Sequence, residues 1–183
     1  MRVIAGNAGG LKLKAPGGLA TRPTSDRVRE ALFDILSTKV VAANFLDLFA
    51  GSGAVGIEAL SRGACKAIFV EKQRAAKEII TENLRWTGFV DQAEVLCLPV
   101  ERALRFLAKG ETKFDLIFMD PPYNLGLVPK TMDLLANADL AKAALVIAET
   151  LTGEELPTSF GLLTLTRRVE YGQTALNFYE EVK

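Results

Sequence analysis

The sequence predicts a single α/β domain built on a mostly parallel β-sheet, and three observations support this. Short apolar runs alternate along the chain with longer amphipathic segments, as in βα units. A glycine-rich turn at 51–56 directly follows the first of these runs, where such a sheet can pass from strand to helix. The 183 residues, 49% hydrophobic and 24% charged, have the composition of an ordinary globular chain of about one domain.

The N-terminal part begins with a short predicted β-hairpin. Segments 3–5 and 11–14 are separated by the glycine-rich stretch 6–10. After a loop containing prolines, Thr24 or Ser25 is suited to cap a helix. The apolar positions of that helix recur at i, i+3, i+4, i+7 and i+8, namely Val28, Ala31, Leu32, Ile35 and Leu36.

Five further apolar runs predict parallel strands, at 44–49, 66–71, 93–97, 114–119 and 143–149. Helices are expected between them, at 53–62, 73–86, 100–108 and 128–136. The runs are nearly continuous, which is typical of strands covered by helices on both faces. The tail differs, because 161–170 and 174–180 flank a turn and predict an antiparallel hairpin at the sheet edge. These five runs and the C-terminal hairpin are the strands that the sequence predicts for the main sheet.

The basic residues are concentrated near the N-terminus, although the formal net charge of the chain is zero. Residues 1–29 carry six basic side chains against Asp26, a net charge of +5, so the remaining residues sum to −5. This asymmetry favours a segment that contacts phosphates, and a merely solvated polar terminus is the alternative. We expect residues 1–22 to form a basic extension that contacts phosphates and residues 23–183 to form the main domain.

The composition also excludes several kinds of site. The chain has no histidine and only two cysteines, Cys65 and Cys97. Ser-His or Cys-His nucleophilic catalysis and a tetrahedral zinc site are therefore excluded, and we expect no metal. The low cysteine content favours a reducing, cytoplasmic setting. No run of about 18 apolar residues is present and the first residues lack a signal-peptide core, so we expect no membrane partner.

The most informative motif is Asp-Pro-Pro-Tyr at 120–123, directly after the apolar run 114–119. Two prolines end both strand and helix, so the motif predicts a stiff loop at the carboxyl end of a strand, where open α/β sheets bind ligands. The Asp120 carboxylate and the Pro121 carbonyl offer two acceptors for an NH2 group, and the Tyr123 ring offers a stacking surface. The alternative is a turn in which the tyrosine only covers the core.

The glycine-rich turn is the second motif. Gly51, Gly53 and Gly56 satisfy the pattern G-x-G-x-x-G, and Glu71 ends the next predicted strand. This pattern is typical of nicotinamide dinucleotide sites, in which the acid binds a ribose. Asp47 counts against a dehydrogenase, because its carboxylate beside the turn would repel a pyrophosphate. It favours the ammonium group of S-adenosylmethionine, and the alternative for the glycines is close helix–strand packing.

Together these motifs resemble a known family. The chain is similar, nearly end to end, to the bacterial small-subunit (16S) ribosomal RNA guanine-N2 methyltransferases of the RsmD family. The glycine turn and the Asp-Pro-Pro-Tyr loop mark only amino-directed methyltransferases, whereas the segment at 22–30 is specific to the family. The matching segments are DLFAGSG at 47–53, FVEK at 69–72, DPPY at 120–123 and RPTSDRVRE at 22–30.

The resemblance implies a Rossmann-like, class I S-adenosylmethionine-dependent methyltransferase with a seven-stranded, mostly parallel sheet and a short N-terminal extension. The implied activity is methyl transfer from S-adenosylmethionine to the exocyclic N2 of one guanine in 16S rRNA of the small ribosomal subunit. The resemblance also implies a monomeric enzyme that can contact ribosomal proteins. The residues implied to grip the guanine are Asp120, Pro121, Pro122 and Tyr123. Those implied for the cofactor are Thr24, Arg27, Asp47, Phe49, Gly51, Gly53, Glu71, Lys72, Val100 and Asp120. Those expected on RNA are Arg2, Lys12, Lys14, Arg22 and Arg29.

One segment departs from the family pattern. An Asp or Asn commonly follows the third strand and binds the adenine amine, but this chain has Leu98, Pro99 and Val100 there. The Val100 amide and apolar contacts are expected to hold the adenine instead.

Two further functions stay open. A DNA adenine-N6 methyltransferase shares both motifs, although 183 residues leave little room for a target-recognition domain. A catalytically silent RNA-binding module that keeps the fold is suggested by Pro99.

Overall fold

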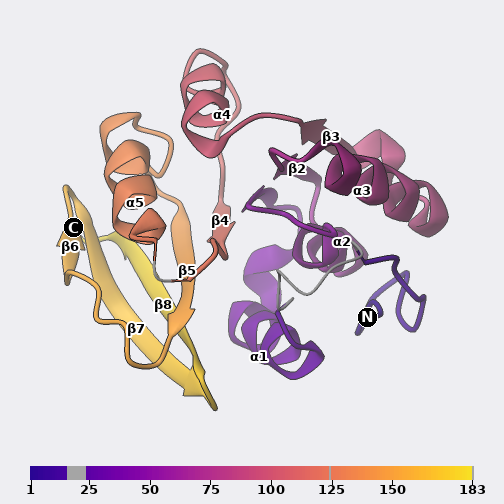
Figure 1. The fold of residues 1–183 in the computed structure, drawn as a ribbon, viewed down its shortest axis with the longest axis horizontal. Helices are drawn as coiled ribbons and strands as arrows, with labels where there is room; N and C mark the ends of the chain where they lie inside the picture. The colour runs from indigo at the N-terminus through magenta and orange to yellow at the C-terminus, as the bar shows by residue number, and fades with distance from the viewer. Residues whose placement is uncertain (16–23, 124, 183) are drawn as a thin grey trace.

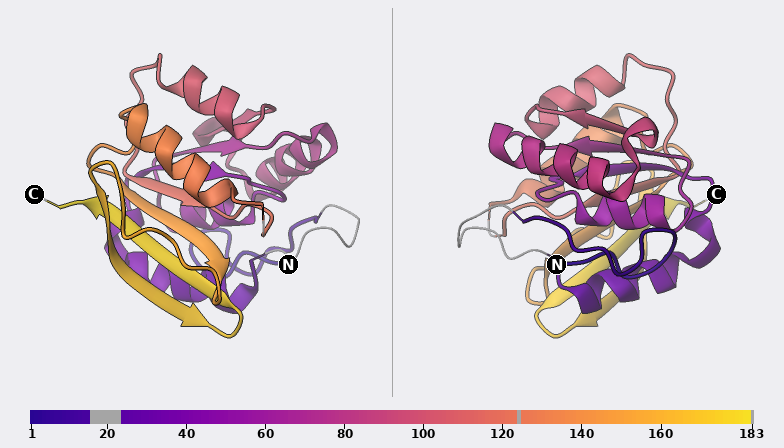
Figure 2. Two further views of the ribbon diagram at one scale, coloured as in Figure 1. Left: turned by 60° about the vertical axis from the view of Figure 1, so that its left-hand side comes forward. Right: turned by 90° about the vertical axis from the view of Figure 1, so that its right-hand side faces the viewer.

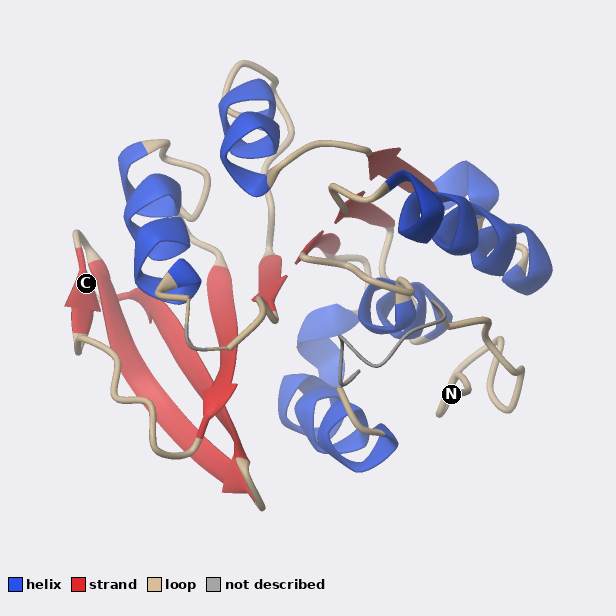
Figure 3. Ribbon diagram, in the orientation of Figure 1, coloured by secondary structure: helices blue, strands red, loops and turns tan. Residues whose placement is uncertain are grey.

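The computed structural model describes residues 1–15, 24–123 and 125–182, and these residues confirm the α/β class. Helices cover both faces of one sheet, which Figure 3 shows by secondary structure. The order of the eight described strands is β3-β2-β1-β4-β5-β8-β7-β6. The strands are β1 (Asn44–Leu48), β2 (Lys66–Val70), β3 (Ala93–Leu96), β4 (Leu116–Met119), β5 (Leu145–Leu151), β6 (Ser159–Phe160), β7 (Leu163–Tyr171) and β8 (Thr174–Glu181).

Each parallel crossover of the described chain contains a helix, as expected from the spacing of the apolar runs. The α-helices are α1 (Asp26–Leu36), α2 (Ala54–Ser61), α3 (Arg74–Thr87), α4 (Val100–Leu107) and α5 (Leu127–Asn137), and the 3-10 helices are η1 (Ser37–Val40) and η2 (Val90–Gln92). Ser25 caps α1, because its side chain accepts a hydrogen bond from the Val28 amide at 3.2 Å.

The strand order reverses beside β1. This strand pairs in parallel with β2 on one side and with β4 on the other. The connections therefore leave β1 and β4 in opposite directions, and a crevice opens at their carboxyl ends. Both sequence motifs begin at these two strand ends, so the topology brings them to the same place (Figure 1).

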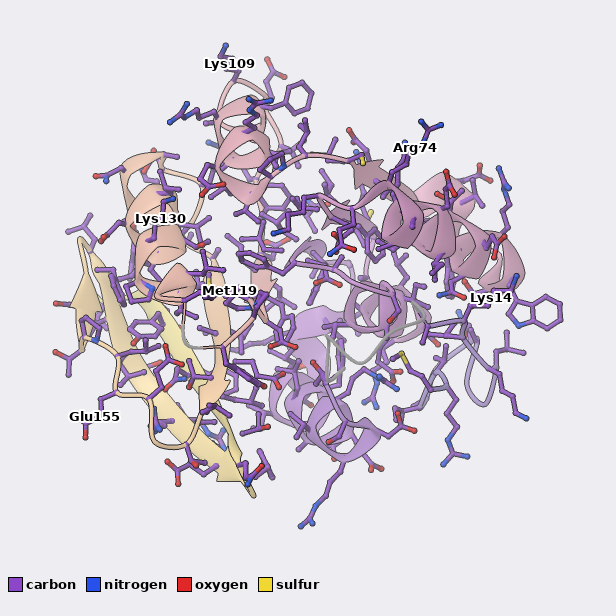
Figure 4. All side chains as sticks on the ribbon, in the orientation of Figure 1. Lys14, Arg74, Lys109, Met119, Lys130 and Glu155 are labelled. Carbon is purple, nitrogen blue, oxygen red and sulfur yellow. The ribbon has the colours of Figure 1, made fainter. Side chains whose placement is uncertain are left out.

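The core lies in two layers, one on each face of the sheet. Alternate residues of β1 point to opposite faces, so Phe45 packs with α1, α2 and α3 while Leu46 and Leu48 pack with α4 and α5. Met119, at the end of β4, is buried in the second layer and lies in the middle of the molecule in Figure 4. Apolar side chains on both faces explain the nearly continuous apolar runs.

The predicted C-terminal hairpin is confirmed as β7 and β8. β8 lies antiparallel between β5 and β7, and the two-residue strand β6 extends the sheet by one strand beyond the seven predicted. β6 was not predicted, because two residues give no measurable alternation.

The predicted N-terminal hairpin is reduced to a single antiparallel bridge between Arg2 and Lys12. Backbone hydrogen bonds still join its two arms, such as the one from the Val3 amide to the Leu11 carbonyl at 2.9 Å. In addition, the amides of Ile4 and Ala5 donate to the Glu58 carboxylate of α2 at 2.7 and 3.1 Å. Val3 is buried in the same core layer as α1 to α3, so this segment belongs to the domain and lies along its helices (Figure 2).

Among the residues described, none of the helices has both the length and the apolar character that a membrane span requires.

Candidate active site

A cavity of about 620 Å³ opens at the carboxyl ends of β1, β2 and β4. This volume is in the range of small-molecule sites, roughly 300–1,000 Å³. Both predicted motifs line it, the glycine turn through Gly51 and the Asp-Pro-Pro-Tyr loop through all four of its residues. The cavity is therefore the place where the sequence motifs meet.

The wall formed by the turn after β1 has an unusual backbone. Gly51 has φ +56° and Phe49 has φ +64°. Glycine adopts such angles freely, but for a residue such as phenylalanine they cost about 1–3 kcal/mol. Phe49 lines the cavity, so the strained backbone lies at the ligand-facing surface.

Asp47 lies in β1, below this turn. Its side chain is buried and accepts a hydrogen bond from the Gly56 amide at 2.9 Å, at the start of α2. Burial raises the pKa of Asp47 to about 7, the Gly56 bond opposes this rise, and the nearby Glu71 charge adds to it. Asp47 lines the cavity, and its ionised form would gain from a cationic ligand group.

Glu71 follows β2 and fixes the glycine turn from the other side. Its Oε2 accepts from the Gly51 amide at 3.0 Å and its Oε1 accepts from the Gln73 amide at 2.8 Å. These bonds point the carboxylate along the cavity wall, next to Lys72. An acid at this strand end has the position expected for a partner of ribose hydroxyls.

The third wall is apolar. Leu98, Pro99 and Val100 all line the cavity where β3 leads into α4. The three residues that replace the usual polar partner thus face the same space as Asp47 and Glu71. Two acids at neighbouring strand ends and an apolar wall suit a nucleoside that carries an ammonium group.

The Asp-Pro-Pro-Tyr loop belongs to a small polar network. Thr24 Oγ1 lies 3.1 Å from Asp120 Oδ2 and 3.0 Å from Glu149 Oε2. The Tyr123 hydroxyl donates to Glu149 Oε1 at 3.2 Å. Thr24 was predicted from the family-specific segment, but Glu149, in β5, was missed. Its only sequence signal is an acidic residue inside a predicted buried strand.

The network shifts the titration of its members. Burial is the main cause that raises the pKa of Asp120 well above its ordinary value, followed by the charge of Glu149, while the Thr24 hydrogen bond lowers it. Burial and the charges of Asp120 and Glu149 raise the pKa of Tyr123. Tyr123 therefore stays protonated and acts as a hydrogen-bond donor.

Two residues predicted to bind the cofactor are not at the cavity. Gly53 does not line it; a Cβ there would lie 3.1 Å from the Ile80 side chain, so this glycine permits close packing of α2 against α3. Arg27 is exposed on α1 and does not line the cavity either. The exposed position is the outward face of an amphipathic helix, which the sequence motif alone did not reveal.

Arg29 was predicted to contact RNA, and this prediction is wrong. Its side chain is 0% exposed and forms ion pairs with Asp26 at 3.0 Å and Glu58 at 3.8 Å. It also donates to the Arg2 carbonyl. Arg29 thus joins α1, α2 and the N-terminal segment, because a buried guanidinium requires acidic and carbonyl partners.

The remaining predicted RNA contacts differ in their surroundings. Arg2, Lys12 and Lys14 are exposed, and Lys14 pairs with Glu82 of α3 at 2.7 Å. Figure 4 shows Lys14 beside α3, on the side of the molecule away from β7. Arg22, and with it the predicted boundary at residues 22 and 23, lies outside the described residues.

Comparisons with known proteins give a consistent result. The family described as Conserved hypothetical protein 95 matches residues 1–180. The chain is 40% identical to ribosomal RNA small subunit methyltransferase D of Escherichia coli K12 over 181 residues, which covers 98% of this chain and 89% of that protein.

Solved structures agree. The structure of a hypothetical protein of Thermus thermophilus is 36% identical, covers 98% of this chain and 99% of its own, and has a TM-score of 0.85. An RNA methyltransferase from Salinibacter ruber, solved with S-adenosyl-L-homocysteine, covers 88% of this chain and 95% of its own; at 15% identity and a TM-score of 0.68 it shows the shared fold alone. The match over residues 1–180 and the 40% identity show that this chain belongs to the Conserved hypothetical protein 95 family, the RsmD family that its motifs resemble.

Proposed function

We propose that this protein transfers a methyl group from S-adenosylmethionine to the exocyclic N2 of a guanine in 16S rRNA of the small ribosomal subunit. One observation carries the proposal: the Asp-Pro-Pro-Tyr loop and the glycine turn line a single cavity. A methyl donor bound at the glycine turn and a planar base bound at the Asp-Pro-Pro-Tyr loop would lie next to each other. The name of the Escherichia coli relative, which refers to small-subunit rRNA, supports the choice of RNA.

The residues that line the cavity fit the cofactor. Asp47 would face the ammonium group, and Glu71 would accept from the ribose hydroxyls with the oxygen lone pairs that the amides of Gly51 and Gln73 leave open. The apolar residues Leu98 to Val100 would contact the adenine. The cofactor, when bound, supplies a methyl group that its sulfonium charge has already activated.

The loop residues would then hold and orient the target amine. Asp120 and the Pro121 carbonyl accept the two amine hydrogens. Tyr123 stacks on the base. Alignment is the main contribution, because a well-oriented reaction avoids most of the entropic cost of bringing two reactants together. Asp120 accepts the proton that the amine releases.

Recognition of the RNA would use the exposed basic side chains of the N-terminal extension. Arg2, Lys12 and Lys14 are the predicted contacts that remain, and they suit phosphates rather than bases. The target guanine has to leave its stack to reach the cavity, which costs a few kcal/mol.

The test is methylation of purified small ribosomal subunits from a strain that lacks this activity, followed by mass spectrometry of the nucleosides. We expect N2-methylguanosine in the small-subunit rRNA. N6-methyladenine in plasmid DNA under the same conditions would instead identify the DNA enzyme. Tight cofactor binding in calorimetry without transfer to rRNA or DNA would identify the silent module, and either result would contradict the proposal.

A further inference from the structure

Trp86, near the end of α3, is the most exposed of the aromatic side chains that the structure describes, at 66%. It is also the single tryptophan of the chain. Tryptophan is usually well buried, because its two rings carry a large apolar area. Exposed apolar side chains that stand alone are nevertheless common, so the neighbours of Trp86 decide whether it has a role.

The N-terminal extension lies against the same part of α3. The Asn83 side chain accepts from the Lys14 amide at 2.8 Å and donates to the Lys14 carbonyl at 2.9 Å. The Lys14 ammonium group also pairs with Glu82 at 2.7 Å, and Figure 4 shows Lys14 beside this helix. Residues three and four positions apart share one side of a helix, so Trp86 lies one turn beyond both contacts. The indole is therefore next to the segment that carries Lys14.

The surroundings of Trp86 are mainly cationic. Lys12, Lys14 and Arg85 are all exposed, and the two lysines stand on either side of a buried residue, as in an extended segment with alternating faces. Glu82 offsets part of this charge. An exposed ion pair contributes little free energy, however, so Lys14 can exchange Glu82 for a phosphate. Cations around an open aromatic ring are the combination with which proteins bind single-stranded nucleic acid.

This surface lies within reach of the cavity. Ala15, directly after Lys14, lines the cavity, and so does Gln73, directly before α3. A helix rises about 1.5 Å per residue, so Trp86 lies roughly 20 Å along α3 from Gln73. A single-stranded loop whose target base enters the cavity can therefore lay a neighbouring part of its strand along this helix.

We propose that Trp86, Lys12, Lys14 and Arg85 form a second contact surface for the rRNA substrate, in which the indole stacks on an unpaired base and the cations contact the flanking phosphates. The inference rests on the proposed methylation of small-subunit rRNA and adds a binding surface outside the cavity. Stacking accepts any base, so the Trp86 surface contributes affinity and leaves the choice of the target base to the cavity.

The first test uses the fluorescence of Trp86. The chain has one tryptophan and protein-free 16S rRNA has none, so all tryptophan emission in their mixture comes from this residue. We expect rRNA to quench the emission and to protect the indole from acrylamide, because a stacked base covers the ring. Unchanged emission and unchanged acrylamide access at rRNA concentrations that saturate binding would overturn the proposal.

The second test measures filter binding of protein-free 16S rRNA over a range of salt concentrations. Trp86→Ala should raise Kd about tenfold, as expected for one lost stacking contact. The slope of log Kd against log salt concentration should stay the same, because stacking releases no counterions. Trp86→Phe keeps a ring and should raise Kd no more than about threefold. Trp86→Leu is apolar without a ring and should bind as weakly as Trp86→Ala.

The matched control is Phe106→Ala. Phe106 is also an exposed aromatic residue, at 56%, but it lies on α4, and its substitution should change Kd by no more than about twofold. An equal loss in Phe106→Ala and Trp86→Ala would contradict a specific role of Trp86.

Three further outcomes would contradict the proposal. Normal binding by Trp86→Leu would indicate a simple apolar contact. A loss with small ribosomal subunits but not with protein-free rRNA would assign Trp86 to a ribosomal protein. A reduced salt slope in Trp86→Ala would mean that the substitution disturbs the extension. If Trp86 stacks on rRNA but the unchanged protein methylates no rRNA guanine, the proposed transfer fails while the Trp86 surface stands.

Discussion

In the proposed transfer, Asp120 accepts hydrogens from an amine in its ionised form, yet burial and the charge of Glu149 raise its pKa. Its hydrogen bond with Thr24 opposes this rise and directs one oxygen, so the other is available to a ligand. The residue thus combines a fixed orientation with an unfavourable charge, which is common at functional sites.

We predict that Asp120→Ala abolishes transfer while cofactor affinity stays largely unchanged. The substitution removes the acceptor for the amine hydrogens but leaves the glycine turn and Glu71 intact. Single-turnover methylation of small subunits and calorimetry with the cofactor measure the two effects separately. Normal transfer by Asp120→Ala would exclude its role in holding the amine.

The Tyr123 ring and its hydroxyl can be separated. Tyr123→Ala should lower kcat/KM by the loss of stacking, about 1–3 kcal/mol per base. Tyr123→Phe keeps the ring and removes only the bond to Glu149, so its effect should be smaller. Equal effects in both variants, measured on the same subunits, would argue against stacking.

Asp47 should make stability depend on pH. Its folded pKa, about 7, lies above the ordinary value of 3.8, so between these values the native state holds a proton that the unfolded chain has released. Stability therefore falls as pH rises through this window, by about 1.4 kcal/mol per pH unit for one group.

Asp47→Asn removes this dependence. The variant should thus gain stability relative to the original between about pH 5 and about pH 8, as measured by urea unfolding at both pH values. A stability difference that is the same at the two pH values would show that Asp47 ionises normally.

At the scale of elements, the close approach of α2 to β2 depends on Gly56. A Cβ at this position would lie 2.3 Å from a ring carbon of Phe69, which is itself fully buried. The same glycine supplies the amide that Asp47 accepts, so the packing of this helix and the lower wall of the cavity are linked.

Gly56→Ala should therefore destabilise the protein by about 1–3 kcal/mol, the usual cost of overpacking a core. In an exposed helix the same change would stabilise by about 1 kcal/mol, so the sign of the effect reports the clash. Gly153→Ala is the matched control, because nothing lies within 4 Å of a Cβ there. Thermal unfolding of both variants gives the comparison, and a neutral Gly56→Ala would mean that α2 can move away.

At the scale of the whole molecule, the described part of the N-terminal extension, residues 1–15, is held in place by the rest of the domain. The Glu58 carboxylate accepts from two of its amides, and buried Arg29 donates to its backbone. The extension thus presents its exposed lysines on a fixed surface rather than on a free arm.

Lys12→Gln combined with Lys14→Gln should weaken binding to small ribosomal subunits. The slope of log Kd against log salt concentration should fall by about one for each phosphate that is no longer neutralised. Lys109→Gln is the control, since Figure 4 shows Lys109 at the far end of α4 from Lys14. Filter binding over a range of salt concentrations measures the slopes. Equal slopes for the double variant and the control would exclude the extension as an RNA-binding surface.

The sequence by itself determined the α/β class, the parallel strands and the loop that follows β4. These follow from local patterns: apolar runs, glycine turns and paired prolines act within a few residues of where they occur. The resemblance to the family rested on the same local segments, and the match of the family to residues 1–180 confirms it.

The tertiary structure alone decided which polar residues meet. Thr24 and Glu149 are 125 positions apart in sequence, and the strand register places Glu149 beside Asp120. The sequence predicts that Arg29 is an exposed cation. In the structure it is buried and contacts Glu58 and the N-terminal backbone. Such contacts depend on how distant elements pack, and no local pattern of residue types records that packing.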